Sequence, residues 1–316
     1  MTDQLKTKLP YLAGILFSSI FGFSFMFTKI TLEYVTPLGL IAYRFLLAFV
    51  TMELLRILKI INIDIDKTSR KKLLLVALLQ PVMYFLFETY GLRLTTSSEA
   101  GMMIALIPVF VTIFGIMFLH EHPVRGQIIF ILLGVSGIIY IQLNKMSGGF
   151  NASLLGGILL FLAVITASLF SIASRDAQKK MKSSEVTYAM MAMGAIVFNI
   201  LYVTQLAFEG RMKDYFLNLA HPEVVLPLLF LGIVASIGAF FLVNYSLSKL
   251  PAHVSSVFAN FSTIVAIAAG TLILNEPFYT YHVIGGFMII TGVYGTAWLN
   301  AKRRKRLKRE NDSGGE

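Results

Sequence analysis

The chain of 316 residues is 56% hydrophobic and only 14% charged, with a mean hydropathy of +0.75. A water-soluble protein of this length could not bury so much apolar surface, so the composition excludes the soluble class and indicates a membrane protein. Cysteine is absent, which excludes disulfides, iron–sulfur clusters and thiolate metal sites.

Ten apolar segments are long enough to cross a membrane, because a spanning helix needs roughly 20 mostly apolar residues. The first follows Lys6 and Lys8 but has no small-residue cleavage site, so we interpret it as a retained span, not a signal peptide. The expected spans are 10–31, 36–56, 71–92, 97–119, 124–144, 153–174, 184–207, 224–245, 252–274 and 278–299. The sequence therefore predicts an all-α membrane protein with ten transmembrane helices.

The lysines and arginines predict the orientation of these spans. With the N-terminus in the cytoplasm, 21 of the 27 fall on the inner side, 5 fall on the outer side, and Arg44 lies within a span. Inner loops of membrane proteins are enriched in positive charge, so both termini are expected in the cytoplasm and the protein in the cytoplasmic membrane. The positive charge of the tail 300–316 is explained better by this rule and by contact with anionic lipid than by binding to nucleic acid.

The chain also contains an internal repeat. Residues 90–121 align without a gap to residues 245–276 at a constant offset of 155, so that Gly115 corresponds to Gly270. Such self-similarity indicates two related units, here residues 10–144 and 153–299, with five spans each. An odd number of spans inverts the second unit in the membrane, which is a transporter design with the substrate between the halves.

Several motifs carry a family resemblance. They include GILFSSIFGFSFMFTKI and PLGLIAYRFLLAF in the first half and VNYSLSKLPAHVSSVFANFSTIVAIAAGTLILNEP in the second. The arginine of the second span (Arg44), the proline of the fourth (Pro108) and the acids after spans four and nine (Glu121, Glu276) also match. The chain resembles the drug/metabolite transporter superfamily, specifically the ten-helix EamA-type permeases. The resemblance implies movement of a small metabolite or drug-like solute, commonly export, without identifying the solute.

The third span has a polar stripe. Gln80, Tyr84 and Glu88 recur every four residues and so share one helix face, beside a helix-kinking Pro81. A polar stripe is costly in lipid, so we expect it to face protein or water and to contact the substrate. Glu88 is also a candidate for proton coupling; the alternative is a carboxylate bonded to a neighbouring helix.

Spans four and nine carry small residues at four-residue spacing. Gly101 belongs to the first set, and Ser256 and Asn260 belong to the second. Such residues permit close helix packing, and they also leave room for a cavity. An amide in mid-span needs a hydrogen-bonding partner, so Asn260 is a candidate cavity residue, as is Asn244 at the inner end of span eight.

The remaining charged candidates have structural or gating roles. Arg44 must be paired or reach water, and the resemblance suggests a structural or gating pair, with direct substrate binding as the alternative. Glu121 and Glu276 follow the core helices and are each followed within two residues by proline. We expect both to fix turns by accepting bonds from the N–H groups that begin the next helix.

The sequence contains no phosphate-binding loop and no nucleophile motif, so neither nucleotide hydrolysis nor enzymatic catalysis is expected. It also predicts no metal and no cofactor. The expected function is secondary transport by alternating access, as efflux of amino-acid-like or amphipathic compounds. The alternatives are uptake or facilitated exchange by the same fold, and a membrane sensor or enzyme. The expected partners are a small-molecule substrate, membrane lipid and protons as coupling ion, with a monomer as the default.

Overall fold

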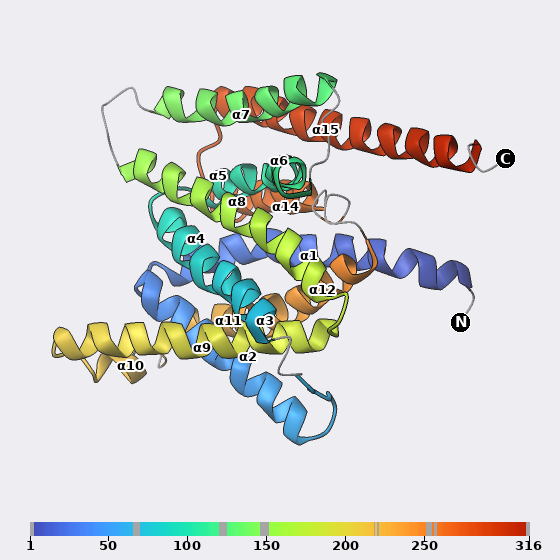
Figure 1. Ribbon diagram of the computed structural model, residues 1–316. Coiled ribbons are helices and arrows are strands. Elements are labelled where there is room, and N and C mark those ends of the chain that lie inside the picture. Colours follow the sequence, from blue (N-terminus) through green and yellow to red (C-terminus); the bar gives the residue numbers. More distant parts are fainter. Residues whose placement is uncertain are drawn as a thin grey trace.

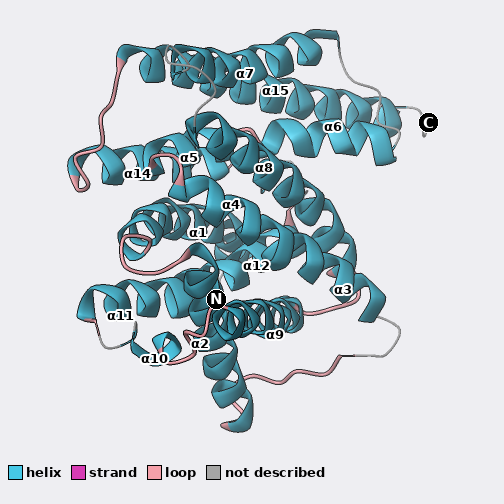
Figure 2. Ribbon diagram, turned by 90° about the vertical axis from the view of Figure 1, so that its left-hand side faces the viewer, coloured by secondary structure: helices cyan, strands magenta, loops and turns pink. Residues whose placement is uncertain are grey.

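The computed structural model describes residues 3–65, 70–119, 125–145, 152–217, 219, 221–250, 255 and 258–313. Within these ranges the chain is helical, with turns and loops between helices and no strand (Figures 1 and 2). The helices of the first half are α1 (Asp3–Thr31), α2 (Pro37–Ile57), α3 (Arg70–Ala77), η2 (Leu78–Met83), α4 (Tyr84–Arg93), α5 (Ser97–Ile104), α6 (Ile107–Leu119) and α7 (Arg125–Lys145). Those of the second half are α8 (Ala152–Ala177), α9 (Ser183–Phe208), α10 (Asp214–Leu217), α11 (Pro222–Leu229), η4 (Phe230–Ala239), α12 (Phe240–Lys249), α14 (Ala259–Leu272) and α15 (Thr280–Ser313).

The expected spans correspond to these helices. Seven helical stretches of the described chain are long and apolar enough to cross a membrane, and two shorter apolar helices cover 128–141 and 260–272. The tenth expected span lies in α15, which continues as helix through the basic segment to Ser313. The prediction of an all-α membrane protein is confirmed.

The third and eighth spans are interrupted at equivalent positions. Each is built from two α-helices joined by a π-helical segment, η2 in the first half and η4 in the second. At the offset of 155, residues 78–83 correspond to 233–238, which lie inside η4. Pro81 lies in η2 and has no N–H to donate, so the expected kink in the third span is present there.

The two halves are intertwined and do not form separate domains. α1 packs along α14, α2 along α9, α4 along α8, and α7 along α15. Both views show the α7–α15 pair at one edge of the bundle and α2 with α9 at the opposite edge (Figures 1 and 2). The helices α1, α4, α8 and α12 lie between these edges.

After α9, residues 209–217 consist of turns followed by the single helical turn of α10 (Asp214–Leu217). This segment is held against the bundle by Tyr215, whose hydroxyl donates to Asn199 Oδ1 at 2.7 Å and whose carbonyl accepts from the Tyr43 hydroxyl at 2.7 Å. Burial raises the pKa of the Tyr215 phenol, so this hydroxyl stays a donor well above neutral pH.

Candidate functional site

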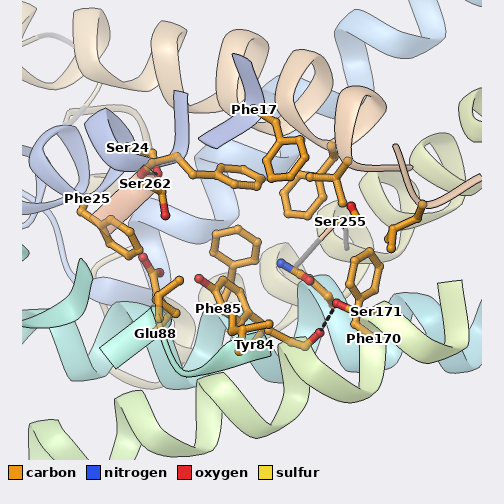
Figure 3. Close-up of a pocket in the computed structure, with 18 of the residues that line it drawn as sticks. Phe17, Ser24, Phe25, Tyr84, Phe85, Glu88, Phe170, Ser171, Ser255 and Ser262 are labelled. Atoms are coloured by element: carbon orange, nitrogen blue, oxygen red, sulfur yellow. Dashed lines mark hydrogen bonds between the residues drawn. The ribbon is translucent and has the colours of Figure 1, made fainter. Parts of the chain in front are cut away.

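A cavity of about 90 Å³ lies between α1, α4, α8 and α12 (Figure 3). Its walls come from both halves of the chain. The aromatic lining consists of Phe17, Phe21, Phe25, Phe85, Phe170 and Phe240. Hydroxyl groups enter it from Ser24, Ser171, Ser255 and Ser262. The site is therefore mostly apolar with a few polar groups, as is typical of small-molecule sites.

The polar stripe of the third span lines this cavity. Gln80, Tyr84 and Glu88 are all buried and all contribute to the wall. Gln80 has an extended backbone, with φ −148° and ψ 114°, at the point where the helix is interrupted. The structure thus places the predicted stripe toward protein instead of lipid.

Arg44 reaches the same cavity from α2 and is only 1% exposed. Its Nε donates to Ser236 Oγ at 2.8 Å, and its guanidinium carbon lies 4.4 Å from the centre of the Phe85 ring. The Nη2 atom is buried without a hydrogen-bond partner in the described chain. A buried guanidinium needs acceptors, so Nη2 can bind an anionic or carbonyl group in the cavity.

The helix contact beneath Arg44 is unusually close. A Cβ atom at Gly232 would lie 3.1 Å from the Arg44 carbonyl oxygen and 2.8 Å from Leu47 Cδ2. Glycine therefore lets η4 approach α2 closely enough for Ser236 to meet the guanidinium. Ser236 in turn donates to the Leu231 carbonyl at 2.8 Å, which fixes its hydroxyl as an acceptor for Arg44.

Glu88 brings a carboxyl group into the cavity and is 2% exposed. Its Oε2 accepts a hydrogen bond from Thr89 Oγ1 at 3.0 Å. Arg44 and Glu88 thus share one cavity, yet their hydrogen bonds go to Ser236 and Thr89 and not to each other. Both side chains therefore present polar groups to the cavity without being bonded to each other.

Asn244 lies outside the cavity. It is fully buried between α8, α9 and α12, where its Nδ2 donates to Thr187 Oγ1 and its Oδ1 accepts from Ser174 Oγ, both at 2.9 Å. We expected Asn244 to contact the substrate, but the structure does not place it in the cavity wall. These two hydrogen bonds of the amide link α12 to α8 and α9, because a buried amide in a membrane protein must find protein partners.

Of the small residues in spans four and nine, Gly101 lies in a packing contact. A Cβ atom there would be 2.5 Å from Ala266 Cβ, and the Gly101 carbonyl accepts from Thr263 Oγ1 at 2.7 Å. Asn260 does not line the cavity, although its Oδ1 is buried without a hydrogen-bond partner in the described chain. Ser256 lies outside the described residues, and its neighbour Ser255 lines the cavity.

Glu276 stabilises a helix other than the one expected. Its two carboxylate oxygens accept from the backbone N–H groups of Ser97 and Ser98 at 2.7 and 3.0 Å, and from Ser98 Oγ at 2.9 Å. It therefore caps α5 of the first half, and not α15, the next helix in the chain. Its counterpart Glu121 lies outside the described residues.

A second buried titratable pair lies outside the cavity. His282 Nδ1 accepts from the Tyr279 backbone N–H at 3.0 Å, and its Nε2 lies 3.3 Å from Glu99 Oε1. Because Nδ1 accepts, the ring proton sits on Nε2 and faces the carboxylate. Within the described chain no group of three His, Asp or Glu side chains could hold a metal ion.

The aromatic wall was missed by reasoning from the sequence. Phe17, Phe21 and Phe25 recur every four residues on α1, the same spacing that revealed the stripe of the third span. Their signal was hidden because phenylalanine is abundant in every span, where lipid contact explains it equally well. Ser171 and Ser262 had no distinguishing signal at all.

Comparison with known proteins identifies the family. The EamA-like transporter family matches twice, at residues 8–143 and 154–298. The chain is 36% identical to the uncharacterized transporter YcxC of Bacillus subtilis (strain 168), over 95% of each chain. It is 27% identical to the uncharacterized transporter YetK of the same organism, over 88% of this chain and 83% of that one. A solved crystal structure shares the fold with a TM-score of 0.60 and 16% identity, covering 93% of this chain and 96% of its own. The chain, an integral multi-pass membrane protein with ten helices in two repeats, belongs to the EamA-like transporter family.

Proposed function

We propose that this transporter moves small amphipathic solutes across the cytoplasmic membrane by alternating access. Its two repeats, residues 10–144 and 153–299, would be inverted relative to each other, with both termini in the cytoplasm. The equivalent π-helical segments η2 and η4 support the relation between the repeats. The excess of lysine and arginine on one side supports the orientation.

One observation carries the proposal: a cavity lined from both halves holds an arginine and a glutamate inside phenylalanine walls. Phenylalanine rings favour an apolar body, and the opposite charges of Arg44 and Glu88 favour a solute with an anionic and a cationic group. This chemistry fits an amino-acid-like or similar amphipathic compound. One water needs roughly 10–15 Å³ of such space, so the cavity of about 90 Å³ is small, and a larger solute requires the helices to part.

Glu88 is the proposed proton-coupling group and Arg44 the proposed gating and binding partner. A carboxyl group in a dry cavity exchanges its proton as the cavity opens to water on either side. Substrate that binds beside Arg44 then changes the field at Glu88. Proton and solute binding are coupled in this way without any further cofactor.

Export is the direction we favour. Uptake or facilitated exchange remains the second candidate, because the same cavity serves either direction and the gradients decide. The two are separated by flux measurements in vesicles of known orientation, with the solute gradient and the proton gradient imposed independently.

The test is solute counterflow in liposomes, preceded by a thermal-shift screen of amino acids, nucleosides, vitamins and cationic drugs. Ala167→Phe fills the cavity from α8 and should abolish counterflow of every solute that wild type carries. Leu162→Phe, on the exposed face of the same helix, is the matched control and should leave flux unchanged. Absence of solute-dependent flux in wild type across the panel would refute the proposal.

A further inference from the structure

Two basic side chains close the ends of two helices in the same manner. Lys29, in the last turn of α1, donates from Nζ to the carbonyl oxygens of Leu92 (3.0 Å) and Thr95, at the end of α4. Arg175, in the last turn of α8, donates from Nη1 to the carbonyl oxygens of Leu247 (3.1 Å) and Leu250, at the end of α12.

The four acceptors are equivalent in the repeat. At the offset of 155, Leu92 corresponds to Leu247 and Thr95 to Leu250. The donors are not related by this offset, but each lies in the last turn of the first helix of its half. Both halves therefore make the same kind of contact at equivalent acceptors, with a lysine donor in the first half and an arginine donor in the second.

Both contacts have a clear energetic basis. The last carbonyl groups of a helix have no partner within the helix, and the helix dipole makes that end negative. A cation that donates to them forms charge-assisted hydrogen bonds, which are stronger than neutral ones. Each contact is stable when made, and it is broken without leaving a strained backbone behind.

The contacts join two groups of helices across the cavity. α1 packs along α12 and α14, whereas α4 packs along α8. The cavity lies between these groups, lined by α1 and α12 on one side and by α4 and α8 on the other. Lys29 links α1 to α4, and Arg175 links α12 to α8, so both cations bridge the same two groups.

The two bridges lie at opposite ends of the cavity. α1 begins at the right of Figure 1 and ends at the left, whereas α8 begins at the left and ends at the right. Lys29 therefore closes the end away from the start of α1, and Arg175 closes the end nearest to it. At the Lys29 end, Arg93 also donates to the Leu32 carbonyl oxygen, so two basic side chains link α1 to α4 there.

We propose that Lys29 and Arg175 are the two latches of alternating access, and this proposal rests on the transport mechanism proposed above. In the structure both latches are closed. Release of the Lys29 latch opens the cavity to the side opposite the N-terminus. Release of the Arg175 latch opens it to the side of the N-terminus, and transport requires that they release in turn.

Cysteine labelling provides the test, because the natural chain has no cysteine. Ser171→Cys places one thiol in the cavity, and a membrane-impermeant thiol reagent is added to either side of vesicles whose orientation is known. Lys29→Met should raise labelling from the side opposite the N-terminus, and Arg175→Met should raise it from the side of the N-terminus. We expect a change of roughly tenfold, with the smaller one for Lys29→Met, because Arg93 still holds that end.

Matched variants show whether the bridging charge is responsible. Lys29→Arg and Arg175→Lys keep a cationic donor and should label like wild type. Lys72→Met removes a basic group from an exposed ion pair with Asp176 and should also label like wild type. Thermal melting of each purified variant identifies any that is misfolded, and that variant is then replaced by the corresponding glutamine.

The outcomes separate the two proposals. If Lys29→Met and Arg175→Met raise labelling from the same side, or from neither, the latch proposal is overturned while solute counterflow can still stand. If wild type shows no solute counterflow, the transport mechanism itself fails whatever the labelling shows. Opposite-sided gains in labelling, together with slowed counterflow in both variants, support the latches.

Discussion

The third span of the first half and the eighth span of the second line the same cavity with different chemistry. Phe85 and its repeat equivalent Phe240 both line it, and so do Glu88 and its equivalent Val243. The first half thus brings a carboxyl group to a position where the second brings an isopropyl group. At these two pairs of positions the repeat places both members at the cavity, and at one of the pairs the chemistry differs.

At other equivalent positions of these two spans, the polar residue of the second half serves packing between helices or supports a residue of the first half. Thr89 in the first half donates to Glu88 and supports the cavity, whereas its equivalent Asn244 links α12 to α8 and α9 away from it. Pro81 interrupts the third span, and its equivalent Ser236 accepts from Arg44. The second half therefore uses its polar residues to hold the scaffold, and the first half uses more of them at the site.

Glu88→Gln is expected to have the largest effect. It keeps the shape of the side chain and removes its charge and its proton exchange, so flux driven by a proton gradient should fall on the order of 100-fold or more. The matched control is Val243→Ala at the equivalent position, where flux should change no more than a few-fold. Flux is measured with and without an imposed proton gradient. Equal losses of flux in both variants would refute the idea that the two halves contribute differently to proton coupling.

Arg44→Lys is expected to reduce solute flux roughly 10- to 100-fold, although it keeps the charge. Lysine can neither donate from the Nε position to Ser236 nor stack its head group on Phe85 as a planar cation. Ser236→Ala removes only the second-half acceptor and leaves Nε unpaired, so it should cost roughly 1–3 kcal/mol of stability and reduce flux less than Arg44→Lys, which also loses the stacking on Phe85. An Arg44→Lys variant with wild-type flux would show that charge alone is required.

Asn244→Leu should lower the free energy of unfolding by roughly 1–3 kcal/mol, because Ser174 and Thr187 lose their shared partner in a buried site. The KM for any transported solute should stay unchanged, since Asn244 does not line the cavity. Thermal melting in detergent and counterflow kinetics measure the two quantities. A raised KM at normal stability would place Asn244 in the substrate path after all.

Gly101→Ala should lower stability by about 1–3 kcal/mol, through overpacking against Ala266. The control is Gly286→Ala in α15, where the nearest atom to the new methyl group is Met102 Sδ at 3.6 Å. That distance is ordinary contact, so melting should hardly change. Equal melting temperatures of the two variants would show that α5 and α14 shift readily to accommodate the added methyl group.

The spans and the stripe of Gln80, Tyr84 and Glu88 were predictable because they depend on local periodicity and on the cost of polar groups in lipid. The kink at Pro81 was predictable for the same kind of reason, since proline acts on its own helix. The helix that Glu276 caps was not, because Ser97 lies 179 residues away and nothing local points to it. The phenylalanine wall was missed, and Asn244 was expected at the cavity but lies outside it, because only packing decides which side of a buried helix faces a cavity.

The pairing of helices across the two halves has a consequence for biosynthesis. Since α1 rests on α14, α2 on α9, α4 on α8 and α7 on α15, the first five spans leave the ribosome before any of these partners exists. They wait in the bilayer with their contact faces against lipid until the later spans are inserted. A chain that ends at mid-length therefore lacks the packing partners of α1, α2, α4 and α7.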